Sequence, residues 1–205
     1  MKRITLKEDL MPYPESYLNN WVEGDYSMIT SSKAPQYIED IIIKKAKARP
    51  GTRFFGEAYV ATTYGKTTKN GWYNSFKWLY ADKWYKGEGL EPQFEEPFFD
   101  ALVKYVGWTK LHTLQRHARD YVETVGLNPQ APDLWLIDKA GKSCFIEVKK
   151  GSDRIHEGQL EGLALIKKYL NAKVSIVSLY PEGGRVPKRI DHTDRFTEIY
   201  NSIID

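Results

Sequence analysis

The fold is decided by residues 132–149, which read PDLWLIDKAGKSCFIEVK. Residues 134–137 form an apolar run, which is typical of a strand that is covered on both faces. Residues 138–142 read Asp-Lys-Ala-Gly-Lys, a composition that favours a turn. Residues 144–149 then predict a second strand. Because the turn between them is short, we expect the two strands to pair in antiparallel fashion.

Further helices and strands are predicted on both sides of this strand pair. Residues 155–170 predict an amphipathic helix, and residues 174–179 predict another buried strand. Ahead of the pair, apolar residues recur at helical spacing over 94–106 and over 114–125. An antiparallel pair followed by a helix that crosses over to a third strand predicts an α/β fold, with a mixed central β-sheet flanked by helices.

The rest of the chain gives weaker signals. We expect an arm over 1–34, a helix from 35 to 48, a strand over 54–63, a polar loop over 65–71, an aromatic-rich helix over 72–85, a short strand over 108–113 and a closing helix over 196–204. On this basis residues 91–205 should form the core. Residues 1–90 should form an N-terminal extension that packs on it.

Three charged residues at the ends of the predicted strands form a candidate site. Side chains alternate between the two faces of a strand, so Glu147 and Lys149 should point the same way. The turn at 138–142 should return Asp133 to their side. Two carboxylates and one ammonium group then converge at one end of the sheet. The same residues also fit an ordinary turn and a strand with one charged face, and spacing alone does not separate the two interpretations.

A pair of carboxylates in such a place suits Mg²⁺ or Mn²⁺, which are hard cations that prefer oxygen ligands. A cation of this kind neutralises a phosphodiester oxygen and acidifies a bound water. A neighbouring lysine can orient that water or hold the phosphate. The functional interpretation is therefore a metal-dependent phosphodiesterase site.

The same residues resemble the motif of the PD-(D/E)XK nuclease superfamily, in which Pro-Asp is followed on the next strand by an acidic residue, any residue and lysine. Pro132-Asp133 and Glu147-Val148-Lys149 match it. Residues 91–180 also resemble the restriction-endonuclease-like αβββαβ core. More narrowly, the chain is similar to the VRR-Nuc branch and to archaeal Holliday-junction resolvases. The features shared with the VRR-Nuc branch are His112, Gly126, the sequence Pro132-Asp133-Leu134 and Gln159; Gln130-Ala131 departs from it, because a glycine is usual before the proline.

The resemblance implies a role for each site residue. Asp133 and Glu147 would bind the metal, with the Val148 carbonyl as a third ligand. Lys149 would orient or activate the water, and Gln159 would support it. The family also implies an acidic residue on the first core helix. Glu95 fits best, since apolar residues follow it at helical spacing, while Glu91 and Glu96 fit less well.

Nucleic-acid contacts would come from local clusters, because the net charge is only +3. Lys150 and Arg154 are the candidate phosphate contacts, although solvated surface charge is the competing interpretation. The sequence Gly65-Lys66-Thr67 does not complete a phosphate-binding loop, since Val60 stands where the first glycine is required.

Composition narrows the class of protein. No apolar stretch approaches the length of a membrane span, and no apolar run follows the basic N-terminus as in a secretory signal. Cys144 is the single cysteine in the sequence, which excludes an intrachain disulfide and fits a reducing, cytoplasmic compartment.

We therefore expect a Mg²⁺-dependent nuclease, an enzyme that acts as an endonuclease or related hydrolase with DNA as its partner. Branched junctions, flaps, linear duplexes, single strands and RNA stay open as substrates. A homodimer is possible by analogy with other superfamily members. Two other classes stay open: a catalytically silent nucleic-acid-binding protein, and a scaffold on which residues 1–90 dock a partner.

Overall fold

The computed structural model of the chain describes residues 2–31, 34, 36–65, 67–73, 101, 104–125 and 129–203. Within these ranges it contains five strands and seven helices. The strands are β1 (Glu8–Tyr13), β2 (Thr68–Tyr73), β3 (Leu134–Asp138), β4 (Ser143–Lys150) and β5 (Lys173–Pro181). The helices are α1 (Glu15–Val22), α2 (Ser27–Thr30), α3 (Gln36–Ala48), α4 (Phe55–Tyr64), α7 (Trp108–Val125), α8 (Glu157–Leu170) and α9 (Thr193–Ser202).

The five strands form one mixed sheet in the order β1-β5-β4-β3-β2. The antiparallel β3–β4 pair is joined by the turn at 139–142, and β2 adds to β3 in antiparallel fashion. The helix α8 then crosses over to β5, which runs parallel to β4. The predicted α/β class with a mixed sheet flanked by helices is confirmed.

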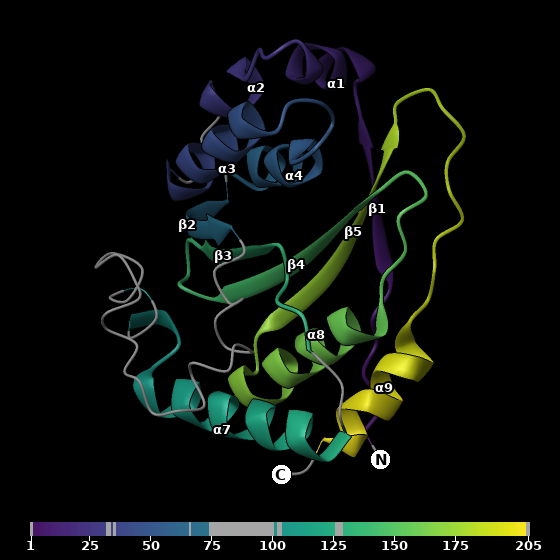
Figure 1. Cartoon of the computed structure of the whole chain (residues 1–205). Helices are drawn as coiled ribbons and strands as arrows, with labels where there is room; N and C mark the ends of the chain where they lie inside the picture. The colour runs from purple at the N-terminus through teal and green to yellow at the C-terminus, as the bar shows by residue number, and fades with distance from the viewer. Residues whose placement is uncertain are drawn as a thin grey trace.

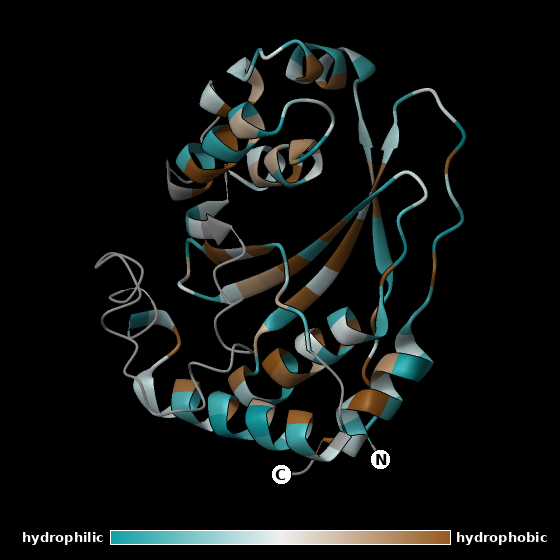
Figure 2. Cartoon of the chain, viewed as in Figure 1, coloured by the Kyte–Doolittle hydropathy of each residue, from teal (hydrophilic) through white to brown (hydrophobic). Residues whose placement is uncertain are grey.

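The helices cover both faces of the sheet (Figure 1). One layer contains α8, with α7 and α9 packed against it, and the other contains α1 to α4. Side chains of the central strands alternate between two apolar cores. Figure 2 shows brown, hydrophobic residues along β3 to β5. Trp135, Phe145 and Ile176 enter the core on the α8 side, whereas Leu136, Ile146 and Val177 enter the core on the α4 side.

Residues 55–64 form helix α4, so the strand predicted over 54–63 is wrong. Aromatic and β-branched residues favoured a strand, but Phe55, Ala58 and Ala61 recur at helical spacing and are buried on the sheet. Gly56 permits this close contact, since a Cβ at this position would lie 3.2 Å from Val148 Cγ1. In chain order, α4 and β2 are followed by α7, and β3, β4, α8 and β5 come after it, so a helix separates the second strand from the third.

Two other predictions of local structure are also wrong. Residues 68–73, expected as the end of a loop and the start of a helix, form strand β2. Residues 108–113, expected as a strand, belong to the single helix α7, in which Leu111, Leu114 and Ala118 are buried at helical spacing. The remainder of the helix expected over 72–85 and most of the helix expected over 94–106 lie outside the described residues.

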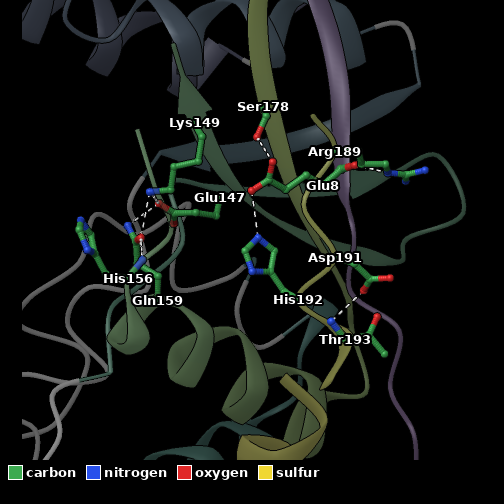
Figure 3. A network of polar contacts seen from close by, with 10 residues as sticks. All are labelled: Glu8, Glu147, Lys149, His156, Gln159, Ser178, Arg189, Asp191, His192 and Thr193. Carbon is green, nitrogen blue, oxygen red and sulfur yellow. Dashed lines mark hydrogen bonds and ion pairs between the residues drawn. The ribbon is translucent and has the colours of Figure 1, made fainter. Parts of the chain in front are cut away.

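The N-terminal segment is part of the sheet and not a separate arm. Strand β1 runs parallel to β5, with Glu8 opposite Ile176. The buried Glu8 carboxylate accepts a hydrogen bond from Ser178 Oγ at 2.9 Å and lies 2.9 Å from His192 Nε2, as Figure 3 shows. Together with β2, this strand places two of the sheet's strands within residues 1–90, the segment expected to form an extension. In the described ranges, no helix has the length and apolar character needed to cross a membrane.

Candidate active site

A pocket of about 480 Å³ lies where β4 ends, between the two helical layers. Its walls come from the segment that leads into α4, from Asp133 just before β3, from the last residues of β4 and from Gln159 on α8. Asp133, Glu147, Val148 and Lys149, predicted as one cluster, all line this pocket. The convergence expected from strand alternation is therefore present.

Asp133 is fixed by the neighbouring strand. Its Oδ2 accepts a hydrogen bond from the Val148 backbone N–H at 2.8 Å. The segment leading to it is held against α8, because the Gln130 N–H donates to the Gly158 carbonyl at 2.7 Å. The contact is so close that a Cβ at Gly162 would lie 1.9 Å from the Gln130 carbonyl oxygen. Glycine in α8 is thus what lets this segment bring Asp133 to the sheet.

Glu147 is held by two side chains that reach it from different elements (Figure 3). Lys149 Nζ donates to Glu147 Oε1 at 2.8 Å, and Gln159 Nε2 donates to the same oxygen at 2.5 Å. Lys149 Nζ also donates to Gln159 Oε1 at 2.9 Å. Gln159 Oε1 accepts a further bond from the His156 backbone N–H at the start of α8, so the helix terminus fixes its orientation.

The structure adds an acidic residue that sequence reasoning missed. Glu57 on α4 lines the same pocket, and its charge interacts with those of Asp133, Lys149 and Lys150. The resemblance implied one acidic residue on a helix, and Glu95 was the residue expected there. Glu95 itself lies outside the described residues. Glu57 could have been found only by assigning residues 54–63 to a helix.

The pKa values of the three acids in this pocket are raised, chiefly by burial. Burial and the nearby Asp133 carboxylate raise the pKa of Glu147 to about 8, despite the opposing effect of Lys149. Burial, together with the Asp133 charge, raises the pKa of Glu57 to about 7. Burial also raises the pKa of Asp133, although the Val148 N–H and Lys149 favour its ionised form. Protons therefore remain on this group of acids near neutral pH.

Lys150 also lines this pocket, which it reaches from the opposite face of β4. Its Nζ donates to the Thr52 carbonyl at 3.1 Å and lies 5.8 Å from the Phe55 ring centroid. Burial lowers the pKa of Lys150. Arg154 is exposed in the loop between β4 and α8 and lines a small neighbouring pocket that shares Lys149 with the candidate site. His112 is exposed on α7 and packs on Trp108, away from the cluster.

The donor chemistry of the pocket fits a hard divalent cation. Three carboxylates and the Val148 segment offer oxygen ligands, and burial, which removes water from the three acids, is the main cause of their raised pKa values. In the part of the chain that the structure describes, no three His, Cys, Asp or Glu side chains are grouped closely enough to hold a metal as they stand. Glu147 Oε1 accepts hydrogen bonds from Lys149 and Gln159, which occupy the oxygen that a metal would need. A cation would therefore compete with the Lys149 ammonium group and with the protons of the acids.

A scan of the sequence against protein-family models gave no match, and a search of curated proteins found no significant match.

Proposed function

We propose that this protein is a Mg²⁺-dependent nuclease of PD-(D/E)XK type, an enzyme that hydrolyses phosphodiester bonds in DNA. One observation carries the proposal: acidic residues from α4, from the segment before β3 and from β4 share a pocket with the buried Lys149. Buried carboxylates that stay protonated near neutral pH destabilise a fold when they ionise. A divalent cation would neutralise them and convert this unfavourable arrangement into a binding site.

Each residue has a role in this proposal. Asp133, Glu147 and Glu57 would hold the cation, with the Val148 carbonyl as a further ligand. When bound, the cation would neutralise a phosphate oxygen and lower the pKa of a water. Lys149 is held by Glu147 and Gln159, so its ammonium group stays at the pocket, where it can orient the attacking water or contact the phosphate. Gln159 is the positioning residue that joins the lysine to the acid.

A protein that only binds nucleic acid fits these residues less well. Three carboxylates in one pocket would repel a phosphate backbone unless a cation lay between them. A scaffold for partner docking would have no use for a buried lysine held between an acid and an amide. The catalytic proposal explains both features with a single ligand.

The identity of the substrate and the assembly remain proposals by resemblance. DNA is the proposed partner, with the shape of the substrate still open among junction, flap, duplex and single strand. A homodimer is proposed by analogy with the superfamily. The cytoplasm is the proposed compartment, since a sequence with the single cysteine Cys144 needs no oxidising environment.

The test is Asp133→Asn, compared with Asp120→Asn on the exposed side of α7 as a matched control. Asparagine can still accept the Val148 N–H bond, so the fold should stay intact. Labelled junction, flap, duplex and single-stranded substrates would be incubated with Mg²⁺ or Mn²⁺. We expect cleavage by the wild type and by the control, but none by Asp133→Asn, which should also lose Mn²⁺ binding in calorimetry. Full activity in a folded Asp133→Asn protein would refute the site, and no cleavage by the wild type of any substrate, RNA included, would refute the function.

A further inference from the structure

A second and larger pocket, of about 690 Å³, lies at the opposite end of the sheet. It is bounded by the starts of β4 and β5, the first turn of α7, the last turn of α8 and the segment that precedes β1. It shares no lining residue with the catalytic pocket among the described residues. We name it the four-lysine pocket after Lys110, Lys142, Lys167 and Lys173, which line it.

Among the described residues, the charged side chains that line the four-lysine pocket are all positive. Its lysines come from four different segments of the chain, and no described aspartate or glutamate lines it. Within the described ranges, none of the four forms an ion pair. Lys167 Nζ donates to the Ala172 carbonyl at 3.1 Å and so caps the end of α8, while Lys110, Lys142 and Lys173 are exposed. Asp138 lies in the adjoining turn. Its Oδ1 accepts hydrogen bonds from the backbone N–H groups of Ala140 and Lys142.

Such an arrangement is a site for an anion with several charges. Like charges around one cavity repel each other, and a polyanion placed between them would remove this repulsion. Lys110 also lies in the first turn of the 18-residue helix α7, where the helix dipole is positive. Each of these effects favours a ligand that carries negative charge.

The walls indicate that the ligand is larger than a single phosphate. The half-buried Tyr105 ring lines the pocket, and a Cβ at Gly141 would lie 3.9 Å from it, so the ring stands next to the turn that carries Lys142. Buried Val106 and Leu170 add apolar surface. Pockets of about 300 to 1,000 Å³ hold small organic ligands. An aromatic wall beside several cations suits a base together with its phosphates.

We propose that the four-lysine pocket binds the phosphate groups of a nucleotide, with the base against Tyr105. The nucleotide could be free in solution or could be a unit of a nucleic-acid strand, since both present the same phosphate and base chemistry. The proposal does not depend on the nuclease assignment, because it uses none of the catalytic residues.

Calorimetry in EDTA tests this with three probes: inorganic triphosphate, ATP and a single-stranded DNA hexanucleotide. The test variant is Lys142→Ala/Lys173→Ala, and the control is Lys139→Ala, which removes an exposed lysine of the same turn that does not line the pocket. We expect the double variant to lose at least about tenfold in affinity for triphosphate and the control to lose less than twofold. Tyr105→Ala should weaken ATP binding but not triphosphate binding.

Comparison of the probes identifies the source of the ligand. Tighter binding of ATP than of the hexanucleotide would indicate a free nucleotide, and the reverse order would indicate a strand. Absence of binding by the wild type, or equal losses in the double variant and in Lys139→Ala, would overturn the proposal. Because no metal is present and no cleavage is measured, neither result bears on the proposed nuclease activity.

Discussion

Replacing Glu57 by glutamine should stabilise the protein at high pH and remove its cleavage activity. The pKa of Glu57 is raised from 4.5 to about 7 by burial and by the Asp133 charge. The folded protein thus keeps this proton in a pH range where the unfolded chain has released it. The free energy of unfolding must then fall as the pH rises from 4.5 to about 7, and stay lowered above that. Glutamine does not ionise, so the free energy of unfolding of the variant does not fall for this reason as the pH rises.

The size of the effect follows from the same pKa difference. Each pH unit between the two values corresponds to about 1.4 kcal/mol, which sets an upper limit of about 3.5 kcal/mol for this single group. The Glu57 side chain is partly exposed, so water reduces this value. We expect Glu57→Gln to raise the free energy of unfolding by about 1 to 3 kcal/mol at pH 8, and by less than about 0.5 kcal/mol at pH 4.5.

Urea unfolding in EDTA at pH 4.5 and pH 8 would measure both values, and Glu123→Gln on the exposed face of α7 is the matched control. Added Mg²⁺ at pH 8 should stabilise the wild type more than Glu57→Gln, because the cation takes over the neutralisation of the acid. Cleavage by the variant should fall at least about a hundredfold, as expected for loss of a positioned charged group. A variant whose stability follows the wild type at both pH values, or that cleaves normally, would refute the reasoning.

Lys149→Met should lower single-turnover cleavage about a hundredfold, since its ammonium group lies among the acids of the pocket. Lys150→Met should leave the chemical step close to wild type, because Lys150 reaches the pocket from the opposite face of β4 and its Nζ donates to the Thr52 carbonyl and not to Glu147; the reverse result would contradict the pairing of Lys149 with the acids. Gly162→Ala should destabilise the fold by about 1 to 3 kcal/mol and reduce cleavage, because its Cβ would push the Gln130 segment and displace Asp133. Thermal unfolding checks this change, and an unaltered melting temperature together with full activity would refute the close contact.

The elements that could be predicted are those in which buried apolar residues recur at a regular spacing along the sequence. The β3–β4 pair, α8 and β5 are covered on defined faces, so their apolar residues recur as the geometry requires. The proximity of the two candidate-site residues on β4 could be predicted directly, because alternation along a strand places Glu147 and Lys149 on one face. For these elements, local sequence and tertiary structure agree.

Helix α4 could not be predicted, because its local composition opposes its structure. Residues 54–63 contain aromatic and β-branched side chains that usually favour a strand. Their helical state depends on contacts with the sheet, including the close approach at Gly56, and these contacts are distant in sequence. Missing the helix also meant missing Glu57. Strand β1 was missed for a similar reason: it contains Pro12 and lies at the sheet edge, and its partner is formed far along the chain.

The pairing of β1 with β5 also determines when the protein can finish folding during synthesis. Glu8 faces Ile176, which is 168 residues further along the chain. At translation rates of about 5 to 20 residues per second, the first strand emerges from the ribosome on the order of ten seconds or more before its partner. His192, which contacts Glu8, follows later still. The nascent chain therefore carries an unpaired first strand until β5 has emerged, and the sheet closes only then.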